Sequence, residues 1–189
     1  MSKPTDRTTH DGKPVDWLTH AALLDVEARL GYELTIVQGS FNAGGVAASA
    51  GTHDGGGAVD LSAWDHENKV REMRRAGFAC WYRPTIPGLW NEHCHAILIG
   101  DRLLSAGAKM QVAEYLRGEN GLANHAPDDG PRDFVNNRYH WQRGARRISR
   151  AATLLERARL LLSTGIRGYR VGNTRKALRD ATSKLPKTR

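Results

Sequence analysis

Apolar residues recur at helical spacing directly after Asp16, and this spacing predicts a helix over residues 17–30. Asp16 is a favourable N-cap residue, and Gly31 is well placed just past the end of the helix. Further helices are predicted over residues 65–75, 106–118 and, from a weak pattern, 132–143, followed by two basic helices over 147–163 and 174–184. For the helix over 65–75, Asp65 is the expected N-cap and Gly77 the expected end.

Short apolar segments between these helices predict strands, which we place at residues 34–38, 58–61, 78–83 and 91–99. Residues 39–57 are rich in Gly, Ala, Ser and Thr and show no apolar periodicity, so we expect a long functional loop there. Helices stand before, between and after the strands without a regular βαβ alternation. This order favours an α+β fold over a doubly wound one.

The chain has 189 residues, 40% of them hydrophobic, which is enough for one compact domain with an appendage. No apolar run approaches the roughly 18 residues of a membrane helix, and residues 1–13 are polar, so we expect neither a membrane span nor a secretory signal. The two cysteines, Cys80 and Cys94, are too few for a disulfide framework or a four-cysteine zinc site. We expect both thiols to be reduced.

The net charge of +8 is unevenly distributed along the chain. Residues 1–140 hold 14 Lys and Arg against 18 Asp and Glu, whereas residues 141–189 hold 14 against 2. We therefore divide the chain into a domain over 1–120, a loop-rich connection over 121–144 and a basic helical extension over 145–189. The extension either packs its apolar stripe on the domain or binds an anionic wall polymer or membrane surface. No nucleic-acid-binding fold signature is present, so we expect no specific nucleic acid partner.

Two segments hold most of the side chains that could bind a metal. In the first, three glycines separate His53 from Asp60. If the chain reverses near Gly56, these two residues become cross-strand neighbours about 5 Å apart. The second segment, residues 90–96, offers Glu92, two imidazoles and a thiol at the start of an apolar strand.

A catalytic zinc ion commonly takes three protein ligands and leaves its fourth position to water. His53, Asp60 and one histidine of the second segment meet that count, and Glu92 would then be the general base. On a regular strand His93 and His95 share one face, while Glu92 and His95 do not. Pairing Glu92 with His95 at one site therefore requires a twist or a bulge beside it.

The first segment, Ser49-Ala-Gly-Thr-His-Asp-Gly-Gly-Gly-Ala-Val-Asp60, resembles the S-x-H-x-x-G-x-A-x-D signature of the zinc D-Ala-D-Ala carboxypeptidases and L-alanyl-D-glutamate peptidases. Glu92 and His95 match the family's second signature, E-x-x-H. The resemblance covers about residues 16–100. It implies a small antiparallel sheet with flanking helices, Zn²⁺ bound by His53, Asp60 and His95, and Glu92 as the catalytic base. The family's substrates are the peptide stems of peptidoglycan.

The chain departs from the family pattern at three places. Gly51 stands where the family has serine, Cys94 stands where it has an aromatic residue, and no arginine follows the first strand. Without that cation, recognition of a free C-terminal carboxylate is less favoured than endopeptidase activity. The expected substrate contacts are polar side chains near the two signatures: Gln38, Ser40, Asn42, Ser49, Thr52 and His93.

The sequence thus predicts a zinc-dependent peptidoglycan peptidase, most consistent with a monomeric bacteriophage endolysin. Such an enzyme would be held in the host bacterial cytoplasm until lysis and would then degrade the cell wall. The alternative is a non-catalytic zinc-containing protein that binds the cell wall or belongs to the virion. A third hypothesis is a protein that binds nucleic acid through its basic tail.

Overall fold

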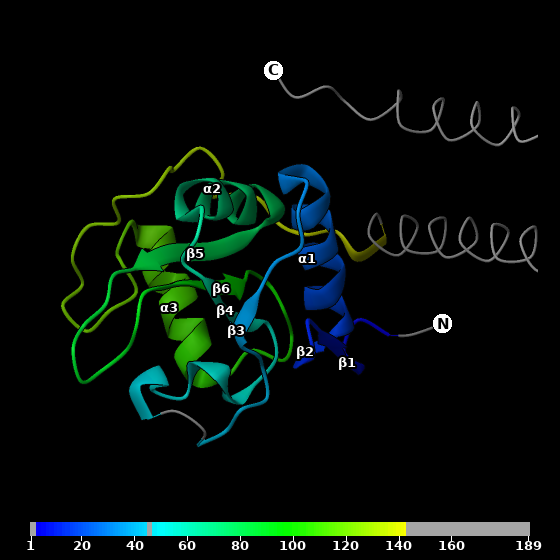
Figure 1. Ribbon diagram of the computed structural model, residues 1–189, viewed down its shortest axis with the longest axis horizontal. Coiled ribbons are helices and arrows are strands. Elements are labelled where there is room, and N and C mark those ends of the chain that lie inside the picture. Colours follow the sequence, from blue (N-terminus) through cyan, green and yellow to red (C-terminus); the bar gives the residue numbers. More distant parts are fainter. Residues whose placement is uncertain (1–2, 45–46, 143–189) are drawn as a thin grey trace, which may run out of the picture. The chain divides into compact units, whose positions relative to one another are not determined.

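The structure is a computed structural model, which describes residues 3–44 and 47–142. The described part has an α+β fold, with a two-stranded hairpin, a four-stranded antiparallel sheet and three α-helices (Figure 1). The hairpin is formed by β1 (Arg7–His10) and β2 (Lys13–Asp16). The sheet has the order β3-β4-β6-β5, with β3 at Ile36–Gln38, β4 at Ala58–Ser62, β5 at Phe78–Arg83 and β6 at His93–Leu98.

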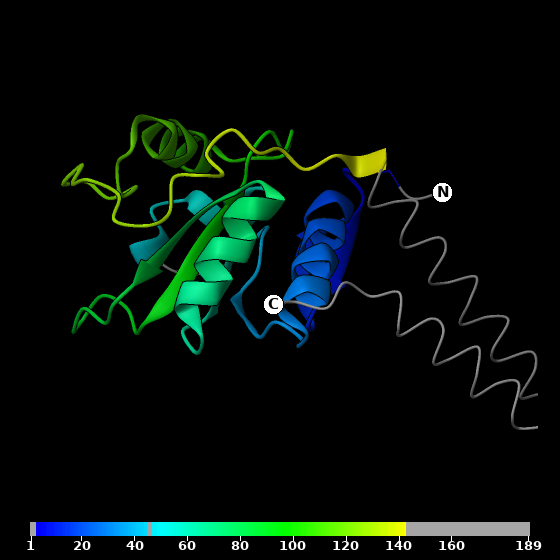
Figure 2. The same ribbon diagram turned by 90° about the horizontal axis from the view of Figure 1, so that it is seen from above.

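The helices cover the two faces of the sheet unequally (Figure 2). The first two helices, α1 (Trp17–Leu30) and α2 (His66–Ala76), pack on one face together with Val59, Leu61 and Cys94. The opposite face packs against α3 (Ala106–Arg117). Successive strand residues point to opposite faces, so alternate residues of β4, β5 and β6 face α3. None of the described helices is both long and apolar enough to cross a membrane.

The ends of the helices confirm most of the predicted boundaries. The Asp16 carboxylate accepts a hydrogen bond from the backbone N–H of Thr19, and Gly31 ends α1 in the left-handed conformation. Asp65 stands at the predicted N-cap position of α2, but its side chain does not accept a hydrogen bond from the helix backbone. Asp65 has a positive φ of 55°, and its carboxylate instead accepts the hydroxyl of Tyr32 and the side-chain amide of Asn68.

The structure differs from the sequence-based expectations at three other places. The hairpin β1–β2 was not predicted, because its strands have four residues each and little apolar character. Residues 132–140 form a turn and irregular segments, not the weak helix expected over residues 132–143. The chain also does not form a hairpin centred on Gly56, since β4 pairs with β3 and β6 and residues 52–54 form a 3₁₀ turn.

Residues 121–142 run along the domain rather than away from it. Asp128 accepts a buried hydrogen bond from Arg74 of α2, and Arg132 donates to the carbonyl of Tyr115 in α3. The predicted loop-rich connection is therefore held against two helices as far as it is described. The basic helical extension over residues 145–189, with its predicted anionic partners, lies outside the described residues.

Two carboxylates are buried together where α1 begins. Asp16 and Asp101 are 0% and 5% exposed, and Asp16 also accepts the backbone N–H of Gly57, so the pair joins α1 to the start of β4. Burial, and next the charge of Asp16, raise the pKa of Asp101 to about 7. In the folded protein Asp101 thus keeps its proton up to about pH 7, whereas in the unfolded chain the Asp101 carboxyl has its ordinary pKa of about 4. The stability that this proton contributes is complete below about pH 4 and is lost as the pH rises through about 7.

We expect Asp101→Asn to flatten this pH dependence and to raise the free energy of unfolding by about 2 kcal/mol at about pH 8. The asparagine oxygen can still accept the backbone N–H of Leu103, and its amide supplies a permanent donor. Urea denaturation at about pH 5 and about pH 8 measures the effect. Asp133→Asn, at an exposed position, is the control and should leave the free energy of unfolding unchanged at both pH values. If the two variants change the free energy of unfolding equally, the pH dependence does not come from Asp101.

Candidate metal centre

The sheet brings three polar residues into one row on the face toward α3. Asp60 of β4 lies opposite His95 of β6, and His95 lies opposite Trp81 of β5. Gln38 of β3 extends the row on the other side of Asp60. In the preceding row Ala58, Ile97 and Ala79 pack under α3. The site therefore lies where the apolar surface under α3 gives way to polar residues.

His53 reaches this row from outside the sheet. It belongs to the 3₁₀ turn Thr52–Asp54, and its side chain is 1% exposed. The turn is followed by Gly55, Gly56 and Gly57, which pack against residues 101–105. A Cβ atom on Gly55 would collide with the backbone carbonyl of Leu103, and one on Gly56 would lie 2.7 Å from the Asp16 carboxylate. These glycines allow close packing of the segment that holds His53, and they do not form the predicted hairpin turn.

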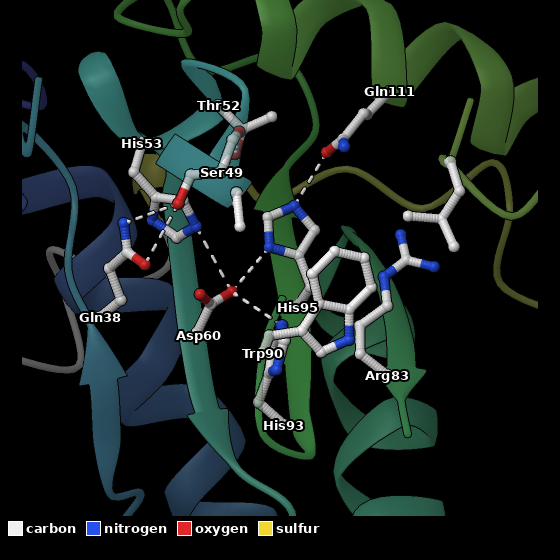
Figure 3. Close-up of a pocket in the computed structure, with 12 residues that line it drawn as sticks. Gln38, Ser49, Thr52, His53, Asp60, Arg83, Trp90, His93, His95 and Gln111 are labelled. Carbon is white, nitrogen blue, oxygen red and sulfur yellow. Dashed lines mark hydrogen bonds and ion pairs between the residues drawn. The ribbon is translucent and has the colours of Figure 1, made fainter. Parts of the chain in front are cut away.

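Three ligand atoms converge in this place (Figure 3). The buried residues His53, Asp60 and His95 each offer one atom, and these atoms all lie within 4.8 Å of one another. Asp60 Oδ1 is 3.3 Å from His53 Nε2 and 2.6 Å from His95 Nδ1. The group could therefore hold a metal ion.

The other ring nitrogen of each histidine is held by an oxygen. His53 Nδ1 lies 3.0 Å from the carbonyl of Gly39, and His95 Nε2 lies 2.8 Å from Gln111 Oε1 of α3. The Gln111 amide itself donates to the carbonyl of Gly121, which fixes its orientation. Because both oxygens only accept, these outer nitrogens carry the hydrogens, and the inner nitrogens direct lone pairs toward Asp60. Two lone pairs 2.6 Å apart on His95 and Asp60 repel unless a proton or a metal ion lies between them.

Where a proton lies between Asp60 and the inner nitrogens, the three groups shift one another's pKa values. Burial opposes ionisation of Asp60, but the charge of His95 and hydrogen bonds from both histidines lower the pKa of Asp60 well below its ordinary value. Burial lowers the pKa of His95. Burial also acts to lower the pKa of His53, but the hydrogen bond and charge of Asp60 outweigh it and raise that pKa. A carboxylate and a neutral imidazole are the forms that bind metals.

No family model matches this chain, and no curated protein or solved structure does. The function must therefore be argued from the site.

The pocket around this group has a volume of about 80 Å³ and contains four of the six predicted substrate contacts. Gln38, Ser49, Thr52 and His93 line it, and the side chains of Gln38 and Ser49 are hydrogen-bonded to each other at 3.1 Å. Ser40 and Asn42 do not line it. The Ser40 hydroxyl is buried and donates to the carbonyl of Ala58, while the Asn42 backbone N–H donates to the carbonyl of His53. Both residues therefore support the polypeptide around the site.

Glu92, the predicted base, is not among the residues that line the pocket. It is exposed just before β6, and its carboxylate accepts the hydroxyl of Tyr82 at 2.8 Å. Tyr82 packs with the core on the face of the sheet toward α1 and α2. The bulge needed to bring Glu92 beside His95 is absent, because β6 pairs with β4 in regular register from His93 to Ile97.

His93 takes the position that the strand geometry favours. It shares a face with His95, lines the pocket, and has Nε2 3.9 Å from Asp60 Oδ1. Its Nδ1 lies 2.7 Å from the carbonyl of Asn91, so Nδ1 carries the hydrogen and Nε2 carries a lone pair.

Sequence reasoning did not identify five residues of the pocket, namely Ala48, Arg83, Trp90, Gln111 and Leu122. The place of Arg83 at the site could have been predicted from the sequence, because Arg83 lies two residues after Trp81 on the same strand and pairs with His93 across the hairpin β5–β6. The predicted strands 78–83 and 91–99, paired about a turn near residue 88, place it on the same face as both histidines. The place of Gln111 could not have been predicted, since nothing in the nearby sequence distinguishes it from other polar residues of a helix.

Both predicted free thiols are confirmed. Cys80 and Cys94 are buried and unbonded to each other. They lie on the face opposite the candidate metal centre, within the core against α1 and α2.

Proposed function

We propose that this chain is a zinc-dependent peptidase that cleaves the peptide stems of peptidoglycan. The observation that carries the proposal is the convergence of His53 Nε2, Asp60 Oδ1 and His95 Nδ1, with both outer ring nitrogens held by oxygen acceptors. Two imidazoles and one carboxylate are a common ligand set of catalytic zinc, and they leave one position open. Oxygen acceptors that orient metal-binding histidines are typical of such sites.

When bound, zinc would lower the pKa of a water molecule toward neutrality and polarise the scissile carbonyl. The chain's own groups must then move the proton. We assign this role to His93, whose Nε2 lone pair faces the pocket and whose ring is fixed by the carbonyl of Asn91. His93 accepts the proton of the attacking water and returns it to the leaving amine. Gln38, Ser49 and Thr52 offer hydrogen-bonding groups to the peptide on the β3 side of the pocket.

The choice between His93 and Glu92 is tested by a pair of variants. We expect His93→Gln to slow the release of peptides from purified peptidoglycan about 100-fold or more. Glu92→Gln should keep a rate within about threefold of the parent, since its carboxylate contacts Tyr82 outside the pocket. Fragments are identified by mass spectrometry, which also shows which bond is cut. Zinc content, measured on the same preparations, should be unchanged in both variants.

The opposite pattern would contradict the assignment to His93. If Glu92→Gln loses activity while His93→Gln keeps it, Glu92 is the base, and the chain before β6 must rearrange when substrate binds. If the parent binds zinc but releases no fragment, the chain is a non-catalytic zinc protein.

This proposal places the substrate in the bacterial cell wall, as expected for a phage endolysin. It draws on the resemblance of the His53–Asp60 and Glu92–His95 segments to the zinc peptidase signatures, together with the geometry of the site. Binding of an anionic wall polymer by residues 145–189 remains a prediction.

A further inference from the structure

One charged group of the pocket has no hydrogen-bond partner in the described part of the chain. Arg83, the last residue of β5, is 5% exposed, and its Nη2 is buried without a hydrogen-bond partner. Within residues 3–44 and 47–142, its guanidinium makes no hydrogen bond or ion pair. The guanidinium instead makes a cation–π contact with Trp81, whose ring centroid lies 5.0 Å from Arg83 Cζ. Among the described residues that line the pocket, Arg83 is the only lysine or arginine.

A second buried arginine shows what a structural role looks like in this fold. Arg74 is 1% exposed, and its guanidinium donates to the carbonyls of Cys80 and Pro131 and to the Asp128 carboxylate. Folding normally leaves a buried guanidinium paired in this way, because water no longer solvates its charge. Burial lowers the pKa of Arg83 only to about 10, so it remains charged at neutral pH.

The sheet fixes where this unpaired charge lies. Arg83 pairs with His93, in the row next to that of Asp60 and His95, so its Cα lies about 7 Å further along the strands. The Trp81 ring contacts both Arg83 and His95, with a centroid separation of 6.1 Å to the His95 ring. Figure 3 shows the guanidinium on the side of His95 away from His53. A ligand that reaches the metal group can therefore also reach Arg83.

We propose that Arg83 binds a carboxylate of the substrate and makes the site selective for peptides that carry one near the scissile bond. This inference rests on the proposed peptidase function and adds a specificity-determining residue to it. The planar guanidinium fork matches the two oxygens of a carboxylate. Arg83 thus supplies from β5 the cation that is missing from the turn after the first predicted strand.

Arg83 bears on the preference for an endopeptidase that the sequence predicts. The absence of arginine after the first strand favours an endopeptidase only where no other cation can bind a free carboxylate. With Arg83 in the pocket, the carboxylate can be a C-terminal one or the α-carboxylate of a γ-linked D-glutamyl residue. Both present the same two oxygens, and the test must separate them.

The test measures binding as well as cleavage, with two matched pairs of ligands. In the first pair, acetyl-Lys-D-Ala-D-Ala is compared with its C-terminal amide. In the second, L-Ala-γ-D-Glu-Lys amide is compared with the same peptide carrying an amide in place of the glutamyl α-carboxylate. Affinities are measured by isothermal titration calorimetry on the metal-free protein and the zinc-loaded protein, and cleavage is measured by mass spectrometry.

For one of the two pairs, we expect the parent to bind the acid about 10-fold or more tightly than the amide. Arg83→Gln should reduce this preference to within about twofold, and Arg83→Lys should retain part of it, since lysine keeps the charge but not the fork. Arg102→Gln removes the same charge from an exposed position and should leave the preference unchanged. Circular dichroism and zinc content verify that each variant is folded and loaded.

The outcomes separate this inference from the proposed function. If Arg83→Gln retains the parental preference, or if the parent shows none in either pair, the assignment of Arg83 is wrong even where the peptides are cleaved. If the parent prefers an acid through Arg83 but cleaves no peptide, the carboxylate site stands and the peptidase proposal fails.

Discussion

Asp60→Asn is expected to lower the affinity for Zn²⁺ on the order of 100-fold and to abolish hydrolysis of wall peptides. Asp60 Oδ1 is the common neighbour of the two histidine nitrogens, at 3.3 Å and 2.6 Å. Asparagine keeps the size of the side chain but removes the negative charge, and its amide group offers donors where a cation needs lone pairs. Competition with a chromophoric chelator at neutral pH measures the affinity, and elemental analysis of the purified protein gives the metal content.

The matched control for this variant is Asp54→Asn. Asp54 lies in the same 3₁₀ turn as His53 but is exposed and outside the pocket. We expect it to bind zinc as the parent does. Parental affinity in Asp60→Asn would show that this group is not the metal centre, and the peptidase proposal would fail with it.

Arg74→Met is expected to lower the free energy of unfolding by about 3 kcal/mol. Its guanidinium joins α2 to β5 and to residues 128–131, and the side chains of Arg74 and Asp128 are both 0% exposed. The substitution leaves the buried Asp128 carboxylate with weaker compensation, from Arg132 and the backbone N–H of Gly130. Denaturation in urea, followed by circular dichroism, measures the loss.

Arg83→Met provides the comparison on the same sheet. Because the Arg83 guanidinium has no hydrogen bond within the described residues, its loss should change the free energy of unfolding by less than about 1 kcal/mol. Equal destabilisation by the two substitutions would indicate that Arg83 has a structural role comparable to that of Arg74.

The parts of the fold that could be predicted are those with local signals. The N-cap of α1 at Asp16, the glycine at its end and the apolar strand 78–83 need only neighbouring residues to be recognised. The hairpin β1–β2 has one such signal, the dipeptide Asp11-Gly12 with positive φ at both residues, but its strands lack the alternating apolar residues that identify strands. Its place beside α1 depends on burial of Val15 in the core, which is not a local property.

The candidate site was partly predictable for a different reason. His53 and Asp60 are predicted from their residue types and spacing, and His95 from the resemblance to the E-x-x-H signature, although the hairpin expected between His53 and Asp60 does not form. The spacing instead reflects a 3₁₀ turn followed by closely packed glycines and a central strand. Glu92 lies just before β6, and the regular register from His93 onward places His93 on the face of the strand that His95 occupies.

The close packing of Gly55 and Gly56 against residues 103–105 also bears on how the centre responds to a ligand. Hydrogen bonds from Phe41 to Gly55, from Asn42 to His53 and from Gly56 to Leu103 hold the turn on both sides. A segment fixed in this way loses little conformational entropy when an ion or substrate arrives, because its backbone is already ordered. Glycines and backbone amides that lie outside the pocket therefore hold His53 in place before any ligand arrives.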